Sequence, residues 1–113
     1  MPRPRERGRV GAGAMQKRTY LVIERFRDGA AAPVYRRFRE HGRLAPEGLA
    51  YVASWVETGL SRCYQVMETA DPALLEQWMD RWRDLADFEV HEVIGSAEAM
   101  ARALGDGGAS GTS

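Results

Sequence analysis

The stretch LAYVASWVETGLSRCYQVMET, residues 49–69, decides which fold this chain can adopt. It contains two segments rich in Val, Tyr and Trp, residues 49–57 and residues 62–69, and these residue types favour strands. A short break around Gly59 separates the two segments. The stretch therefore predicts a β-hairpin.

Further segments surround this hairpin in an order that is typical of one architecture. Alternating apolar and polar residues predict a strand at residues 19–27 and another at residues 88–94. A helix is expected over residues 33–41, because the segment begins with a proline, which suits the first helical position. Asp71 followed by Pro72 predicts the start of a second helix. The order β-α-β-β-α-β predicts an α+β fold, in which two helices cover one face of a four-stranded antiparallel sheet.

The second helix carries large apolar side chains at helical spacing. They recur at intervals of four, four and three residues and are expected to form the main ridge of the core: Leu74, Trp78, Trp82 and Leu85. Gly95 is expected to end the last strand, and a short extra helix is expected over residues 96–104.

The composition is that of one soluble globular domain. The chain has 113 residues, of which 44% are hydrophobic. Cys63 is the only cysteine, which excludes an intramolecular disulfide and the usual multi-cysteine zinc site. No apolar run approaches the roughly 18 residues that a membrane span needs, and the charged N-terminus is followed by no apolar signal segment. A cytoplasmic protein without membrane association is expected, and the sequence contains no motif for a metal or a cofactor.

The formal net charge of zero hides an uneven distribution along the chain. Residues 1–18 contain six basic side chains and one acidic side chain, a balance of +5, which leaves −5 on residues 19–113. The first segment is rich in Arg, Pro and Gly and is expected to be a disordered leader. Two interpretations of it stay open: a solvated extension in front of a second start at Met15, or an electrostatic anchor for nucleic acid. The folded domain is expected over residues 19–95, and a flexible tail over residues 105–113.

Both faces of the predicted sheet carry bulky apolar residues. In the first strand, Leu21 and Ile23 point to one face, and Val22 and Phe26 point to the other. Sheets with one solvated face usually alternate cleanly between apolar and polar residues, so the face that the helices leave open is expected to be covered. A second copy of the same sheet would cover it in a symmetric homodimer. A cavity between the two sheets would then hold a small-molecule ligand.

The length of the hairpin loop decides which side chains would line that cavity. A loop of four residues places Trp55 opposite Tyr64. The same loop places Glu57 opposite Arg62, which gives an ion pair at the mouth of the hairpin. A loop of three residues places Trp55 opposite Cys63 instead. We favour the four-residue loop, because it forms both an aromatic pair and an opposite-charge pair.

The candidate ligand-binding residues follow from this choice. The four-residue loop would place one set of side chains on a shared face: Tyr51, Trp55, Tyr64 and Glu68. The three-residue loop would add Gln65 to the face of Trp55. With the polar residues of the outer strands included, the predicted lining is Glu24, Tyr51, Trp55, Tyr64, Gln65, Glu68 and His91.

Glu24 and His91 are the candidates for catalysis within this set. A carboxylate and an imidazole that face one apolar cavity can exchange protons with a substrate near neutral pH. The alternative is that both side chains are paired with neighbours or lie at the rim of the sheet. Cys63 lies in the middle of a strand and is expected to be a small buried hydrophobic residue rather than a nucleophile.

Three segments carry a resemblance to a known family: VYRRFREHGRLAPEGL at residues 34–49, SWV at residues 54–56 and RCYQVME at residues 62–68. With their surroundings, residues 20–99, they closely resemble the small bacterial proteins grouped as domain of unknown function 3303. The resemblance implies the dimeric α/β-barrel variety of the ferredoxin-like fold. It implies no activity and no catalytic residues.

Three functions are compatible with these observations. The first is binding of a small organic ligand in the cavity on the open face. The second, as the alternative, is a cofactor-independent enzyme, of oxygenase or isomerase type, that uses Glu and His for acid–base chemistry. The third is a nucleic-acid-binding module, because the RNA-recognition motif has the same element order. Its third strand should carry a basic–Gly–aromatic–Gly–aromatic run, whereas RCYQVMET has one aromatic residue and no glycine, which argues against nucleic acid as a partner.

Overall fold

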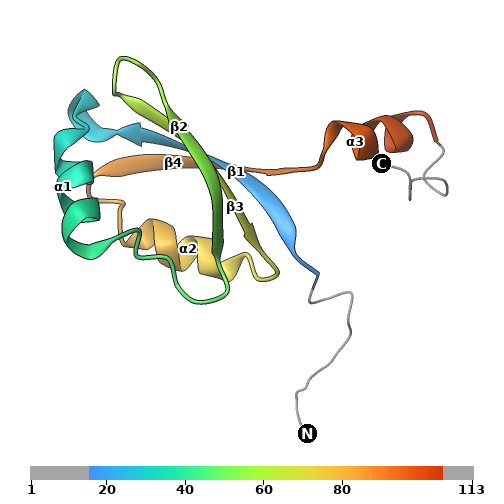
Figure 1. Ribbon diagram of the computed structural model, residues 1–113, viewed down its shortest axis with the longest axis horizontal. Coiled ribbons are helices and arrows are strands. Elements are labelled where there is room, and N and C mark those ends of the chain that lie inside the picture. Colours follow the sequence, from blue (N-terminus) through green and yellow to red (C-terminus); the bar gives the residue numbers. More distant parts are fainter. Residues whose placement is uncertain (1–15, 106–113) are drawn as a thin grey trace, which may run out of the picture.

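The computed structural model of the chain describes residues 16–105, and Figure 1 shows the arrangement of their helices and strands. The elements in chain order are β1 (Arg18–Phe26), the 3-10 helix η2 (Arg27–Gly29), α1 (Ala32–His41), β2 (Ala50–Val56), β3 (Arg62–Thr69), α2 (Ala73–Asp80), β4 (Ala86–Val93) and α3 (Ser96–Ala103). The four strands form one antiparallel sheet in the order β2-β3-β1-β4. The predicted α+β class and ferredoxin-like element order are confirmed, with one added C-terminal helix.

The two predicted terminal segments fall largely outside the described residues. The leader expected at residues 1–18 overlaps them only from residue 16, and the tail expected at residues 105–113 overlaps them only at residue 105. Within residues 16–105, no helix has both the length and the apolar character that crossing a bilayer requires.

The hairpin between β2 and β3 has the four-residue loop that the sequence favours. Trp55 lies opposite Tyr64, and the Glu57 N–H donates to the Arg62 carbonyl oxygen at 2.9 Å. Arg62 Nη1 lies 3.8 Å from a carboxylate oxygen of Glu57, which forms the expected ion pair at the mouth. The register that these pairs set continues from β3 into β1, where Tyr64 lies opposite Ile23.

A bulge in β2 changes the face of one predicted site residue. Tyr51 lies opposite Met67, but Ala53 lies opposite Val66, so Val52 is the extra residue. An extra residue reverses the alternation of side chains on one side of it. The prediction that Tyr51 shares a face with Trp55 is therefore wrong, since Tyr51 lies on the helix-covered face.

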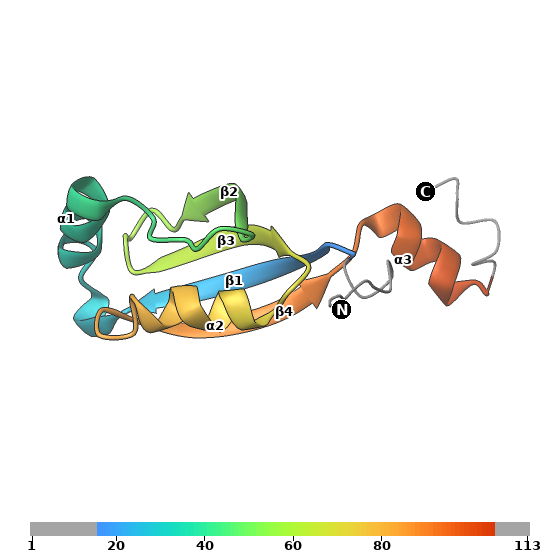
Figure 2. The same cartoon turned by 90° about the horizontal axis from the view of Figure 1, so that it is seen from below.

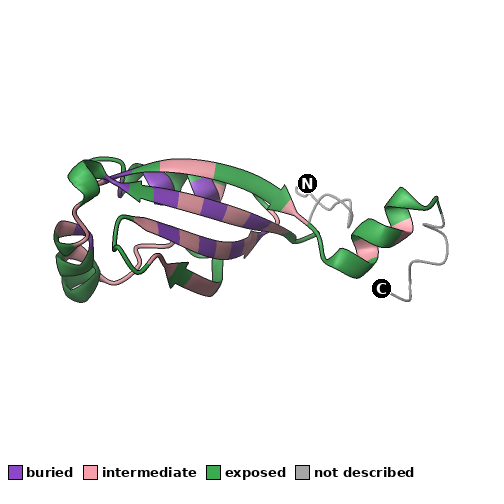
Figure 3. Cartoon of the chain, turned by 90° about the horizontal axis from the view of Figure 1, so that it is seen from above, coloured by how far each residue is buried: buried purple, intermediate pink, exposed green. Residues whose placement is uncertain are grey.

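The covered face of the sheet packs against α2 and forms the core. In Figure 3, buried and half-buried residues alternate along β1 and β3, which is the pattern of a sheet with one covered face. Figure 2 shows α2 lying along this face. The buried apolar side chains of the strands and α2 include Tyr20, Val22, Phe26, Met67, Leu75, Trp78 and Met79.

The second helix is shorter than its apolar pattern predicts. It ends at Asp80, and residues 81–85 form turns that lead into β4 at Ala86. Trp82 stays buried within these turns because its backbone N–H still donates to the Met79 carbonyl oxygen at 2.9 Å. Leu85 is partly buried. Half of the predicted ridge, Trp82 and Leu85, therefore lies in the turns after α2 rather than in the helix.

Helix α1 stands at the end of the sheet rather than flat against it (Figures 1 and 2). Val34 is its one buried residue, and Tyr35 and Phe38 are each about two-fifths to one-half exposed, at 46% and 41%. Arg37 ties the helix to the turns after α2 through two hydrogen bonds to Asp84, at 2.8 and 2.6 Å. The corner between α1, α2 and the sheet holds the candidate site.

Candidate functional site

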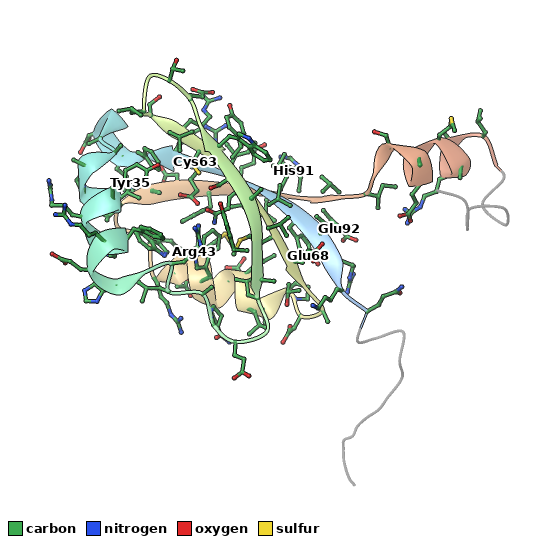
Figure 4. All side chains as sticks on the ribbon, viewed as in Figure 1. Tyr35, Arg43, Cys63, Glu68, His91 and Glu92 are labelled. Carbon is green, nitrogen blue, oxygen red and sulfur yellow. The ribbon has the colours of Figure 1, made fainter. Side chains whose placement is uncertain are left out.

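A cavity of about 190 Å³ lies between α1, the end of α2 with the turns that follow it, and the helix-covered face of the sheet. Its walls come from three strands, two helices, the loop after α1 and the turns after α2: Glu24, Phe26, Val34, Tyr35, Phe38, Arg43, Ser54, Cys63, Gln65, Trp78 and Trp82. Figure 4 shows Tyr35, Arg43 and Cys63 gathered beside α1, whereas Glu68, His91 and Glu92 lie farther along the sheet toward α3. Five of the eleven lining residues are aromatic, and a carboxyl, a guanidinium and an amide lie among the rings.

Glu24 is a lining residue of the cavity whose pKa is raised to near neutrality. It lies in the middle of β1 and is only 8% exposed, with Cys63 opposite it on β3 and Phe88 opposite it on β4. Burial raises the pKa of Glu24 from 4.5 to about 7, because the ionised carboxylate loses its water, and the positive charge of Arg43 offsets part of this rise. Glu24 can therefore take up or release a proton at neutral pH.

Arg43 follows directly after α1, in the loop that leads to β2. Its guanidinium carbon lies 3.6 Å from the ring centre of Tyr51 and 5.2 Å from that of Phe38, in contacts that hold the planar group by cation–π attraction. The Arg43 backbone carbonyl accepts hydrogen bonds from the indole N–H groups of Trp78 and Trp82, at 3.1 and 3.0 Å. Two indoles and two further rings thus fix both the backbone and the side chain of this residue.

Gln65 lines the cavity with a side-chain amide of which only the oxygen has a hydrogen-bond partner among the described residues. Its side chain is only 3% exposed, and its Oε1 accepts a hydrogen bond from Arg43 Nη1 at 2.7 Å. Because arginine can only donate, this contact assigns the oxygen of the amide to the Arg43 side and the nitrogen to the other side. Nε2 is buried and has no hydrogen-bond partner among the described residues. Such a group costs about 1–3 kcal/mol, and an acceptor atom placed in the cavity would recover that cost.

Two further titratable residues of the cavity, Cys63 and Tyr35, are neutral at neutral pH. Burial, with a smaller effect of the Glu24 charge, raises the pKa of the Cys63 thiol to about 12. Burial also raises the pKa of Tyr35 above its usual value, with smaller contributions from Cys63 and Glu24. A thiol of this acidity is a poor nucleophile, in agreement with the interpretation of Cys63 as a small buried hydrophobic residue.

The predicted site residues are divided between the two faces of the sheet. Three lie on the helix-covered face, where Glu24 and Gln65 line the cavity and Tyr51 stacks on Arg43. The other four lie on the open face: Trp55, Tyr64, Glu68 and His91.

The four open-face residues have surroundings of their own. Trp55 is 62% exposed, and the Tyr64 hydroxyl donates to Glu57 at 2.5 Å. His91 Nε2 lies 2.5 Å from a carboxylate oxygen of Glu89 on the same strand. Because His91 and Glu24 lie on opposite faces, they do not form the acid–base pair that the sequence suggests.

Several residues of the cavity are not anticipated by the sequence pattern. In the sequence pattern, Arg43 is one of several basic residues around the first helix, and Trp78 and Trp82 are expected as core residues only. The signal for Arg43 is its place directly after Gly42, which ends α1 with φ of 73° and turns the chain back toward the sheet. Within residues 16–105, no group of three or more His, Cys, Asp or Glu side chains is arranged to hold a metal ion.

Comparisons with known proteins place the chain in a family. A search of curated proteins found no match. Among solved structures, the chain is similar to the NE2512 protein of unknown function from Nitrosomonas europaea, with a TM-score of 0.42 and 16% sequence identity over 71% of this chain and 92% of that chain. The family described as Domain of unknown function (DUF3303) matches residues 18–105. Since this match spans most of the sequence and includes every element of the fold, the chain belongs to the DUF3303 family, as the resemblance of residues 20–99 predicts.

Proposed function

We propose that this protein binds a small organic molecule in the cavity between α1, α2 and the sheet. The observation that supports the proposal most directly is the amide of Gln65, a lining residue of the cavity, whose buried Nε2 has no hydrogen-bond partner among the described residues. Buried polar groups in native proteins are nearly always paired, and those that are not call for a missing partner. A bound molecule with an acceptor oxygen supplies one.

A ligand of about one ring suits the volume of the cavity. An engineered apolar cavity of about 150 Å³ in another protein binds benzene, and the cavity of this chain measures about 190 Å³. A six-membered ring with one small polar substituent fits that volume. The cavity that we propose as the site lies on the helix-covered face, and a second cavity on the open face between two copies stays a prediction.

Native mass spectrometry of the full chain purified from its own host tests the binding. We expect the wild-type protein to retain a small molecule and the Gln65→Met variant to lose most of it, because methionine keeps the volume but removes the donor. The matched control is Glu68→Gln, which changes a residue of the same strand on the opposite face and should retain the molecule. A wild-type chain that carries no molecule, or a Gln65→Met variant that keeps it, would contradict the proposal.

A second candidate function is acid–base catalysis on the bound molecule. The observation that favours it is the pKa of Glu24, about 7, within reach of the same cavity. The same purification separates the two functions, since a Glu24→Gln variant of an enzyme should retain an unconverted substrate of different mass. A binding protein should retain the same molecule with or without the carboxyl group.

We also propose that the open face of the sheet joins two copies in a homodimer. Supporting this, the face carries half-buried Leu21, Ile23 and Val66 together with the exposed ring of Trp55. A standard interface buries roughly 800 Å² per partner, which a four-stranded sheet can supply.

Measurement of the oligomeric state tests the proposed homodimer. We expect the native mass to be twice that of the chain and Trp55→Asp to convert the protein to monomers, because a charge would be buried at the interface. Leu60→Asp is the control, since Leu60 is also exposed but lies in the hairpin loop. A wild-type protein that stays monomeric at high concentration refutes the dimer.

A further inference from the structure

We propose that the ligand of this cavity is a small aromatic carboxylate, and that its binding is accompanied by uptake of one proton at Glu24. The inference rests on the proposed binding function and specifies its ligand. It is carried by three properties of the cavity: the donors that it presents, the charges that it holds and the shape of its walls.

The donors of the cavity call for an acidic oxygen group. Gln65 Nε2 has two N–H donors and no acceptor among the described residues. Arg43 has five N–H donors, of which one, on Nη1, donates to Gln65 Oε1. A hydroxyl or an amine would satisfy such donors poorly, because each brings donors of its own. A carboxylate brings two oxygens and no donor, and its charge matches the fixed positive charge of Arg43.

The charges of the cavity require that a proton accompany the anion. With Glu24 ionised, its negative charge balances that of Arg43, and a bound carboxylate would add an unbalanced charge beside the buried Glu24. With Glu24 protonated, the cavity is positive and a carboxylate neutralises it. The carboxyl group of Glu24 can then also donate its O–H to the ligand.

Among residues 16–105, no other group that faces Glu24 competes for this proton. Cys63 on β3, Tyr35 on α1 and Arg43 in the following loop are the titratable groups whose charges act on Glu24 or on which it acts. The pKa values of Cys63 and Tyr35 are raised, so both stay protonated at neutral pH. The residue opposite Glu24 on β4 is Phe88, and α2 and the turns after it contribute the neutral side chains of Trp78 and Trp82.

The walls of the cavity favour a flat, apolar body for the ligand. Five aromatic side chains from four segments line it: Phe26, Tyr35, Phe38, Trp78 and Trp82. Aromatic rings pack against one another in offset or edge-to-face contacts, so a planar ring gains more here than a branched chain of equal volume. The structure therefore fits a single ring that bears one carboxylate.

Isothermal titration calorimetry of the full chain with benzoate, benzamide and benzylamine as probes tests the inference. Benzoate should bind wild-type protein about tenfold more weakly at pH 8.5 than at pH 7.5. Above the pKa of Glu24, each pH unit lowers the protonated fraction of Glu24, and with it the affinity for benzoate, about tenfold. Titrations in buffers of different ionisation enthalpy should give an uptake approaching one proton. Benzamide, a neutral molecule of the same shape, should bind with equal affinity at both pH values, and benzylamine should bind least.

Two variants and the possible negative results separate the carboxylate assignment from the proposed binding function. Glu24→Gln should bind benzoate with no dependence on pH in this range, and Gln65→Met should weaken benzoate and benzamide alike. The carboxylate assignment is wrong if benzamide binds but benzoate binds no better than benzamide at pH 7.5. It is also wrong if benzoate binds equally well at pH 7.5 and pH 8.5. In both cases the proposed binding function stands. If none of the three probes binds, both the carboxylate assignment and a single-ring ligand are wrong.

Discussion

The Glu24→Gln variant is expected to be more stable than the wild-type protein at pH 8, by about 3 kcal/mol in the free energy of unfolding. The buried carboxyl of Glu24 has a pKa of about 7 in the folded chain and about 4.5 in the unfolded chain. Each unit of difference corresponds to about 1.4 kcal/mol. Glutamine has nearly the same shape and carries no charge, so it avoids the cost of an ionised group in this position.

The sign of the pH dependence follows from the raised pKa. Between about pH 4.5 and pH 7 the folded chain binds more protons at Glu24 than the unfolded chain does, so the free energy of unfolding falls as the pH rises. The contribution of the protonated carboxyl is fully present below about pH 4.5 and is lost once the pH has passed 7. The variant and the wild type should therefore have equal stability near pH 4 and diverge above it.

Urea-induced unfolding at a series of pH values measures this difference. Glu47→Gln is the matched control, because Glu47 is an exposed residue of the loop before β2 and its charge costs little. The control should follow the wild-type curve at every pH. A Glu24→Gln variant that is less stable than the wild type at pH 8 would show that the ionised carboxylate is compensated by the fold, and the site would then lack a group that titrates near neutrality.

The sequence predicts the sheet well because its signals are local. Alternation along residues 19–27 and 88–94 assigns each side chain to a face within its own strand, and the charges of Glu57 and Arg62 select the hairpin loop. These are short-range properties, so no knowledge of distant contacts is needed. The family is predicted separately, through the resemblance of residues 20–99, and the family match confirms it.

The candidate site is predicted only in part because it depends on contacts between distant segments. Alternation within a strand does not say which face it shares with another strand, so Glu24 and His91 appear as partners although the register separates them. The bulge at Val52 has no glycine or proline to announce it. Arg43 reaches the cavity because two tryptophans more than 30 residues away bind its carbonyl, and no local pattern encodes that contact.

Replacing Trp78 with Ala is expected to lower the free energy of unfolding by about 3–5 kcal/mol. The indole is only 2% exposed and packs against Phe88 with 5.7 Å between ring centres. Its removal leaves a cavity beside the one already present, in a corner where α1 contributes little packing. The measurement is urea-induced unfolding at several protein concentrations, which separates the stability of the chain from any association of copies.

Two further tryptophan variants show which property of Trp78 matters. Trp55→Ala should change the stability of the isolated chain by less than about 0.5 kcal/mol, because Trp55 is 62% exposed. Trp78→Phe keeps most of the buried ring and loses the indole N–H, but Trp82 still donates to the Arg43 carbonyl, so its cost should be far smaller than that of Trp78→Ala. If Trp78→Phe lowers the free energy of unfolding as much as Trp78→Ala does, the hydrogen bond to the Arg43 carbonyl, rather than the packing of the ring, holds this corner together. Benzoate affinity should then fall with stability in both variants, because the loop that carries Arg43 would no longer be fixed over the cavity.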